Sequence, residues 1–416
     1  MKHSKILVAG IAVAAAASAS ADLMDRAGGI KVGERLTLRP YVSVGYTYDS
    51  NVDSSRKDKS GSSWTINPGV GIDYAGDNWG LKGAAYYTYH AYHHYSSQLN
   101  SSSFGENLAF DWHNSAADEK GWTVTLSETY QRVSQDDDMS NNGGRGIGRD
   151  YDQVSFNGVI ERRINQRLHA GLEASYYYLD YDNNVDKYAA MYGWQRSTIG
   201  GEMGYMYSRW LDLLVAASYH RYWQENDKQR SPYYSSYTAR GNKISDKSEG
   251  WSLMGGFGSR ATERITYRAL VGWSRFDYGD GAKKLDGWTY QLSGQWQISN
   301  TLNLMVLGSS FYQPSETHYG TATKTYTFSA GLAKALVRGK LRSTLDLAYR
   351  KEAAEYTEYE TDDYDSDYYT GRFGLNYTLN RFLTAFSSVE YQFCSSDRKS
   401  YDYDRWRLTL GLRMAY

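Results

Sequence analysis

The sequence predicts an all-β fold, an antiparallel up-and-down transmembrane β-barrel of about 18 strands, with about 16 as the alternative count. The clearest observation is the C-terminal run LTLGLRMAY, which alternates strictly with period 2. One face of this run carries Leu408, Leu410, Leu412, Met414 and Tyr416. Soluble domains rarely end this way, because a bare apolar strand edge invites aggregation. A closed barrel in a membrane has no free edge, and it needs this strand to pair with the first one.

The N-terminal residues are typical of an exported protein. Two lysines precede an apolar run over 6–17, and an A-x-A cleavage site follows at 19–21. The run is too short to cross a bilayer as a helix. The predicted divisions are a signal peptide at 1–21, a periplasmic N-terminal segment at 22–35 and an outer-membrane β-barrel at 36–416.

The composition is compatible with a barrel, although hydropathy alone would indicate a soluble protein. Beyond the signal peptide no stretch of about 18 apolar residues exists, so no transmembrane helix is expected. The mean hydropathy is −0.66, which suits a barrel because only every second residue of a strand faces lipid. The four prolines suit continuous β-ladders. The net charge of −1 gives no reason to expect a nucleic-acid partner, and the single cysteine cannot form an internal disulfide.

Connections between the alternating segments change regularly between short and long, which is typical of an outer-membrane barrel. The short connections are 76–78, 165–166, 262–264, 300–301, 338–340 and 380–381. The long ones, rich in Asp, Ser, Asn, Lys and Gly, are 49–61, 136–150, 183–191, 225–249, 279–286, 314–322, 357–366 and 395–402. We expect both termini on the periplasmic side, and the loop 225–249 is the best candidate for a plug.

The strands are expected between these connections, at a spacing of roughly 20 residues. The predicted ranges are 36–48, 62–75, 79–95, 102–114, 122–135, 151–163, 168–182, 192–207, 211–224, 250–261, 265–278, 287–299, 302–313, 323–336, 341–356, 367–379, 382–394 and 403–416. A membrane strand needs roughly 9–11 residues, so the remainder fills turns and loops. A soluble propeller would need repeated blade motifs, which the sequence lacks.

Two short motifs resemble those of known barrels. The segment GYTYDSNV, Gly45–Val52, closes the first predicted strand. Its Tyr-Asp-x-Asn-Val pattern resembles the opening of the putative β-barrel porin 2 family. A final aromatic residue after alternating apolar ones also resembles the assembly signal of bacterial outer-membrane barrels. The resemblance implies an outer-membrane barrel, in some members encoded beside polysaccharide-export genes, and it implies no catalytic residues.

In several strands the apolar phase is clear, so the opposite phase is expected to face the lumen. Leu345 and Leu347 face lipid, for example, so Asp346 between them faces inside. A cationic side chain on the lipid face near the midplane costs about 2–4 kcal/mol, which constrains the assignment. The charged residues predicted to line the pore are Glu173, Glu202, Arg268, Arg342, Arg350, Arg372, Arg405, Arg407 and Arg413.

These charges predict a polarised lumen. Glu173 and Glu202 fall on the seventh and eighth predicted strands, whereas Arg350, Arg372 and Arg407 fall near the end of the chain. Around a barrel of this size the two groups lie on opposite walls, which gives a transverse field across a water-filled pore. The alternative is that these charges solvate the interior or pair within one wall.

Aromatic and histidine residues have two interpretations each. Most aromatics fill the two interfacial girdles of a barrel, but Tyr41, Tyr86, Tyr92 and Tyr177 are phased inward. Their rings either stack on sugar rings or occupy solvated strand ends. Three histidines lie at 90–94, but the first two face opposite sides of a strand. No metal site and no cofactor are therefore predicted.

The predicted function is an outer-membrane porin-like channel for passive diffusion of small hydrophilic solutes, including saccharides. The alternative is a structural or polysaccharide-export accessory barrel without free diffusion. No Ser-His or Asp-His spacing indicates an enzyme. The expected partners are outer-membrane lipid and lipopolysaccharide, periplasmic chaperones, the barrel assembly machinery and small hydrophilic solutes, and no nucleic acid.

Overall fold

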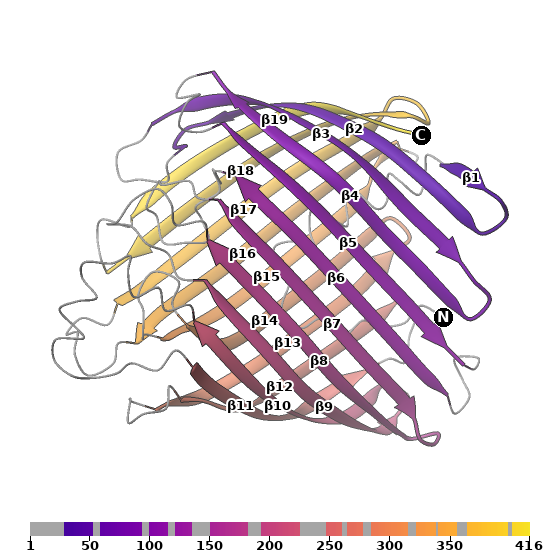
Figure 1. Ribbon diagram of the computed structural model, residues 1–416, viewed down its shortest axis with the longest axis vertical. Coiled ribbons are helices and arrows are strands. Elements are labelled where there is room, and N and C mark those ends of the chain that lie inside the picture. Colours follow the sequence, from indigo (N-terminus) through magenta and orange to yellow (C-terminus); the bar gives the residue numbers. More distant parts are fainter. Residues whose placement is uncertain are drawn as a thin grey trace.

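The fold is a closed β-barrel seen from its side in Figure 1, with strands strongly tilted to the barrel axis. The computed structural model describes residues 29–52, 59–93, 100–114, 121–134, 150–181, 193–224, 247–259, 264–277, 284–314, 322–337, 340–355, 364–397 and 402–416. In this part of the chain no helix is long and apolar enough to cross a membrane. The predicted signal peptide and most of the loop 225–249 lie outside the described residues.

The described residues form nineteen strands in one sheet. Their bounds are β1 Ile30–Val32, β2 Leu36–Asp49, β3 Gly61–Ala75, β4 Trp79–Tyr92, β5 Ser101–His113, β6 Trp122–Ser134, β7 Tyr151–Arg163, β8 Leu168–Tyr181, β9 Trp194–Ser208, β10 Leu211–Gln224, β11 Lys247–Ser259, β12 Ile265–Asp277, β13 Leu285–Ser299, β14 Leu302–Pro314, β15 Ala322–Ala335, β16 Leu341–Glu355, β17 Tyr364–Thr378, β18 Leu383–Ser396 and β19 Tyr403–Ala415. The predicted strands correspond to β2–β19 one by one, and their ends differ by one to three residues where they differ.

Each strand from β2 onward pairs antiparallel with the next, and β19 pairs with β2 to close the barrel. The prediction of an antiparallel 18-strand barrel is confirmed. The C-terminal strand pairs along Arg407–Ala415 with Asp49–Tyr41, as its alternation predicted. The additional strand β1 was not predicted; it folds back on β2 through a turn at Gly33, whose φ of 71° favours glycine.

The turns that precede β2 and β4 lie at the same end of the barrel as the C-terminus. Arg35 of the first turn forms an exposed ion pair with Asp77 of the second. The backbone N–H of Tyr416 donates to the carbonyl of Pro40, near the start of β2 (3.0 Å). In Figure 1 the label of the C-terminus and strand β1 lie together at the right-hand end. This arrangement separates the turn end of the barrel from the end where the long connections emerge.

The outer face of the barrel is marked by exposed apolar side chains. Leu172 and Ile199, for example, are 68% and 69% exposed, as expected of residues that lipid covers in a membrane. Glu106 of β5 and Glu128 of β6 depart from this pattern. Both are exposed and share the phase of Leu108 and Leu126, so they lie on the outer face near the middle of their strands.

Among the described residues, the wall has two layers where β13 and β14 separate at the loop end of the barrel. The ladder of these strands runs only from Gln291 opposite Ser309 to Ser299 opposite Leu302. Beyond it Tyr312 shares the phase of the outward-facing Leu304, yet its ring lies 6.2 Å from that of the inward-facing Phe276. The end of the β14–β15 hairpin therefore lies inside the barrel, against the inner faces of the preceding strands.

Candidate functional site

The inner wall of the barrel carries the polar side chains. Along β8 the exposed Leu172 and Tyr176 alternate with less exposed residues that include Glu173. Along β19 the exposed Trp406, Leu408 and Leu412 alternate in the same way with the arginines. The structure places the following predicted residues on this inner phase: Glu173, Glu202, Arg268, Arg342, Arg350, Arg372, Arg405, Arg407 and Arg413.

Two of the predicted residues meet on the wall formed by β9–β12. The guanidinium of Arg268 donates to one carboxylate oxygen of Glu202 through Nε at 2.9 Å and through a terminal nitrogen at 2.6 Å. Its other terminal nitrogen donates to Gln291 at 2.8 Å. Glu173 instead accepts a hydrogen bond from the Asn157 amide at 3.1 Å. The Glu202 carboxylate is thus compensated on its own wall, one of the two alternatives that the sequence allowed.

The opposite wall carries a ladder of alternating charge. On β16–β19 and β2, each member is directly opposite the next in strand register, in the order Asp346, Arg372, Glu390, Arg407 and Asp49. The Nε of Arg407 donates to Glu390 at 3.0 Å. Opposite charges at directly opposed positions stabilise a sheet, so this ladder also holds the closing strands together.

The carboxylates Glu390, Asp49 and Glu352 were missing from the predicted site. Glu352 forms an ion pair with Arg350 at 3.3 Å, and Asp49 accepts hydrogen bonds from Arg405. Their alternation with apolar neighbours was available in the sequence, as for Glu390 beside the exposed Val389. Assigning every charged residue of each strand to the inner or the outer face would have found them.

The two halves of the inner wall still differ in charge. On β2–β10 acidic residues predominate: Asp49, Asp73, Asp111, Glu161, Glu173, Glu202 and Asp212, against Arg39, Lys82, Arg163 and Arg196. On β11–β19 basic residues predominate: Arg268, Arg342, Arg350, Arg372, Arg405, Arg407 and Arg413, against Asp346, Glu352 and Glu390. The charges almost balance over the whole described wall, with an excess of each sign on one side.

The inward hairpin end narrows the mouth at the loop end of the barrel. Tyr222 of β10 donates its hydroxyl to the carbonyl of Tyr312 at 2.9 Å. Thr289 of β13 donates to the carbonyl of Ser310 at 2.7 Å. The cluster buried around this contact consists of Leu179, Tyr181, Trp194, Tyr222, Phe276, Leu285, Tyr312 and Ala322. Among the described residues, this hairpin end occupies the position for which the sequence suggested the loop 225–249.

Some inward aromatic rings pack on glycines of the next strand. The end of the Tyr41 ring, on β2, occupies the space that a side chain at Gly69 of β3 would need. It lies 2.5 Å from the position that a Cβ atom would take there. Tyr86 of β4 covers Gly105 of β5 in the same way. Each ring therefore lies against the wall and keeps part of its surface toward the lumen. Tyr92 and Tyr177 lie nearer the loop end of the barrel. Tyr92 is buried, and Tyr177 packs against the buried cluster around Tyr312.

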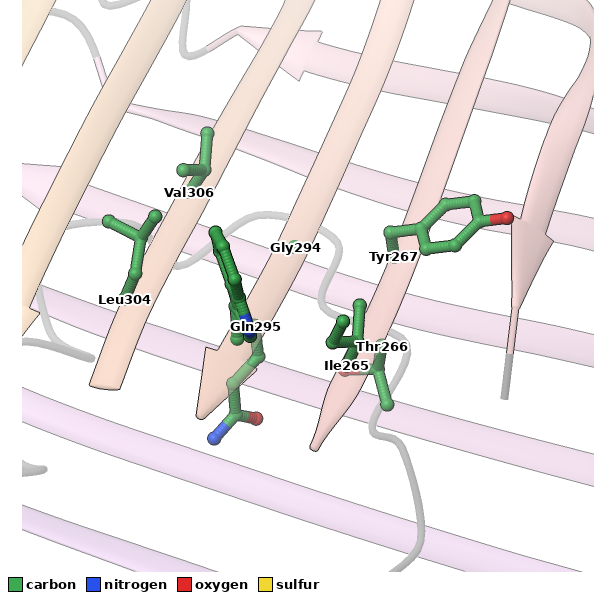
Figure 2. Close-up of a pocket in the computed structure, with 8 residues that line it drawn as sticks. Ile265, Thr266, Tyr267, Gly294, Gln295, Leu304 and Val306 are labelled. Carbon is green, nitrogen blue, oxygen red and sulfur yellow. The ribbon is translucent and has the colours of Figure 1, made fainter. Parts of the chain in front are cut away.

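Figure 2 shows a shallow groove on the other side of the wall. Its floor is Gly294, and the apolar side chains around it include Tyr267, Leu304 and Val306. These side chains have the phase of the lipid-facing residues, so an acyl chain fits this groove better than a polar solute. The groove is separate from the inner wall.

The histidines do not gather into a metal site in the part of the chain that the structure describes, where no cluster of metal-binding side chains is found. His90 Nδ1 lies 2.9 Å from the hydroxyl of Thr65. His94 lies outside the described residues, as do the acidic runs of the long loops.

Comparison with known families decides the class of this barrel. The family model described as putative beta-barrel porin 2 matches residues 26–416. The chain belongs to the putative β-barrel porin 2 family. The predicted resemblance to this family is therefore confirmed. As a member of this family, the protein is a non-enzymatic barrel of the outer-membrane transport type.

Comparison with single proteins adds little beyond the family. No curated protein matches the chain. Among solved structures, the siderophore receptor PirA of Pseudomonas aeruginosa is 8% identical, with a TM-score of 0.42 over 93% of this chain and 81% of that one. The outer membrane protein OpdK of Pseudomonas aeruginosa is 12% identical, with a TM-score of 0.41 over 91% and 99%. The ferric-catecholate import receptor Fiu of E. coli K12 is 8% identical, with a TM-score of 0.39 over 92% and 82%.

Proposed function

We propose that this family member is a channel for passive diffusion of small hydrophilic solutes, including saccharides, across the outer membrane. The observation that carries the proposal is the closed 18-strand barrel with charged and hydroxyl side chains on its inner phase. Barrels of 16–18 strands leave an aqueous channel, whereas about eight strands leave only enough room for side chains. A polar inner wall at this strand number favours water over a packed core.

The charge pattern supports small polar solutes of low net charge. Arg407 with Glu390 and Arg268 with Glu202 are compensated pairs, so the wall has little net charge to repel either sign. The excess of acids on one half and of bases on the other orients dipolar solutes across the pore. In this proposal Glu173, Arg342, Arg372 and the other predicted charges line that pore.

The proposal includes an orientation. Long loops of outer-membrane barrels face the outside and short turns face the periplasm. The C-terminus and β1 lie at the turn end (Figure 1), so both termini belong on the periplasmic side. Lipid and lipopolysaccharide then surround the apolar outer face, and periplasmic chaperones and the assembly machinery deliver the chain.

Liposome swelling tests the proposal. Proteoliposomes with the folded protein should swell in glucose, in disaccharides and in small amino acids at rates that fall with solute size. Empty liposomes provide the baseline. The same protein unfolded by heat before reconstitution controls for leaks that protein addition causes.

The inward hairpin end favours a second candidate, an accessory barrel with a closed mouth. The contact between Tyr222 and Tyr312 seals part of the loop end. Liposomes that fail to swell in every solute, although the protein is folded, would support this candidate and contradict the channel.

A further inference from the structure

Arg413 differs from the other arginines of the closing strand. Arg405 is bonded to Asp49, and Arg407 to Glu390. For Arg413, near the turn end of β19, no hydrogen bond or ion pair to a carboxylate occurs among the described residues, and its Nε is buried without a partner. An arginine is fully charged at neutral pH and carries five donors. A partly buried guanidinium that has no acceptor within the described structure is suited to an acceptor from outside.

A second buried group without a partner lies beside it. Thr384 of β18 is directly opposite Arg413 in the ladder and on the same face. Thr384 is 1% exposed, and its hydroxyl has no hydrogen-bond partner within the described structure. A buried polar group without a partner costs free energy. The Nε of Arg413 and the hydroxyl of Thr384 are two such groups at adjacent positions, so they indicate a place where another polar molecule completes the hydrogen bonds.

Aromatic rings flank this position on both sides. The guanidinium of Arg413 lies 5.7 Å from the ring centroid of Phe386, the inward residue above Thr384 on β18. On β2, Tyr41 is diagonal to Arg413 in the register. The end of the Tyr41 ring covers Gly69 of β3. Aromatic surface beside a guanidinium fork suits a ring that bears an anionic group.

We propose that Arg413, Thr384, Phe386 and Tyr41 form a binding site for the carboxylate of an acidic sugar that passes through the barrel. Arg413 binds the carboxylate through its fork, the Thr384 hydroxyl donates a further hydrogen bond, and the sugar ring packs against Phe386 and Tyr41. This site rests on the proposed function, because it needs a lumen that admits the sugar. It names one class of solute, uronates, that the channel retains longer than neutral sugars.

Block of the ion current through single channels in planar bilayers tests the site. Glucuronate and glucose are the probes, and the half-blocking concentration is measured for each. Wild-type protein should be blocked by glucuronate at a concentration at least about tenfold lower than Arg413→Gln, and glucose should discriminate little between them. Arg413→Lys keeps the charge but loses the fork, so it should lie between the two. Thr384→Val should weaken glucuronate block without changing charge.

Arg167→Gln is the matched control. Arg167 lies in the turn between β7 and β8 at the same end of the barrel and donates to the outward-facing Tyr205. The variant removes the same charge outside the lumen, and it should retain wild-type block. Equal half-blocking concentrations for Arg413→Gln and Arg167→Gln would overturn the site.

Direct binding separates a failure of the site from a failure of the channel. Calorimetric titration of folded protein in detergent with glucuronate does not depend on conduction. If bilayers show no channels but glucuronate binds wild type and not Arg413→Gln, the result supports the binding site and contradicts the channel function. If channels form and glucuronate binds both proteins equally, the channel stands and the site falls.

Discussion

Asp49 is the last residue of the first barrel strand, β2, and Arg405 lies near the start of the last strand, β19. Both carboxylate oxygens of Asp49 accept a hydrogen bond from the Nε of Arg405, at 3.0 and 2.9 Å. Both side chains are almost fully buried, with 4% and 1% exposure. Asn51 extends the contact, because its amide donates to the carbonyl of Asp404 at 3.0 Å. The Tyr-Asp-x-Asn-Val segment thus joins β2 to β19 at the loop end, where their ladder ends with Asp49 opposite Arg407.

The first prediction concerns this closing contact. Asp49→Asn should lower the free energy of unfolding by about 3–5 kcal/mol, because it removes the negative charge that faces the buried Arg405 guanidinium. Urea unfolding in lipid vesicles, followed by the mobility shift of folded barrels in gels, measures the change. Asp77→Asn breaks an exposed pair with Arg35 and should cost no more than about 1 kcal/mol. Similar losses in both variants would contradict the role of Asp49.

The second prediction concerns the doubled wall. Tyr312→Ala should raise single-channel conductance, because it removes the ring that packs on Phe276 and loosens the hairpin end from the inner face. Phe328→Ala is the control on the same hairpin, since Phe328 is 44% exposed on the outer face. If the two variants conduct alike, the hairpin end does not restrict the mouth.

The third prediction concerns Glu106 and Glu128 on the outer face. Replacing either by leucine should raise the free energy of unfolding in a bilayer by about 1–2 kcal/mol, since a carboxylate in contact with lipid is unfavourable, although less so than Arg or Lys. Glu390→Leu should act in the opposite direction, because it removes the partner of Arg407. A destabilised Glu128→Leu variant would mean that this carboxylate has a favourable role in the wall.

The fold was predictable from the sequence because one face of each strand is apolar. Alternation gave the 18 barrel strands, and β1 was missed because three residues are too few to show a period. The doubled wall at Tyr312 was not predictable, because it depends on how the upper end of β14 packs against strands distant in sequence. Glu128 shows that charge alone does not decide which face of a strand a residue occupies. Its apolar neighbours at Leu126 and Val124 place it outside, whereas its charge alone would place it inside.

The candidate site was only partly predictable for a related reason. Phase placed Arg407 and Arg268 on the inner wall, but their partners depend on register and on side-chain reach across strands. Glu390 is directly opposite Arg407, and Glu202 reaches Arg268 from three strands away. Neither contact can be inferred from the local sequence pattern of a single strand.

The fourth prediction concerns ion selectivity. Charges alternate along the ladder of Asp346, Arg372, Glu390, Arg407 and Asp49, and acids and bases almost balance over the described inner wall, so wild-type channels should show weak selectivity in a salt gradient. Arg372→Glu combined with Arg407→Glu makes every member of the ladder acidic. The reversal potential should then shift toward cation preference, and more at low salt, because screening acts over roughly 8 Å at physiological ionic strength. An unchanged reversal potential would place these residues away from the conducting path.

Water and ions should pass through this barrel, and single-channel recording in planar bilayers measures such passage directly. Purified folded protein, checked by its gel mobility shift, is added to one side of a bilayer in molar potassium chloride. We expect discrete, uniform current steps that scale with bulk conductivity and grow in Tyr312→Ala. A folded protein that inserts but gives no steps, in wild type and in Tyr312→Ala alike, would contradict this expectation.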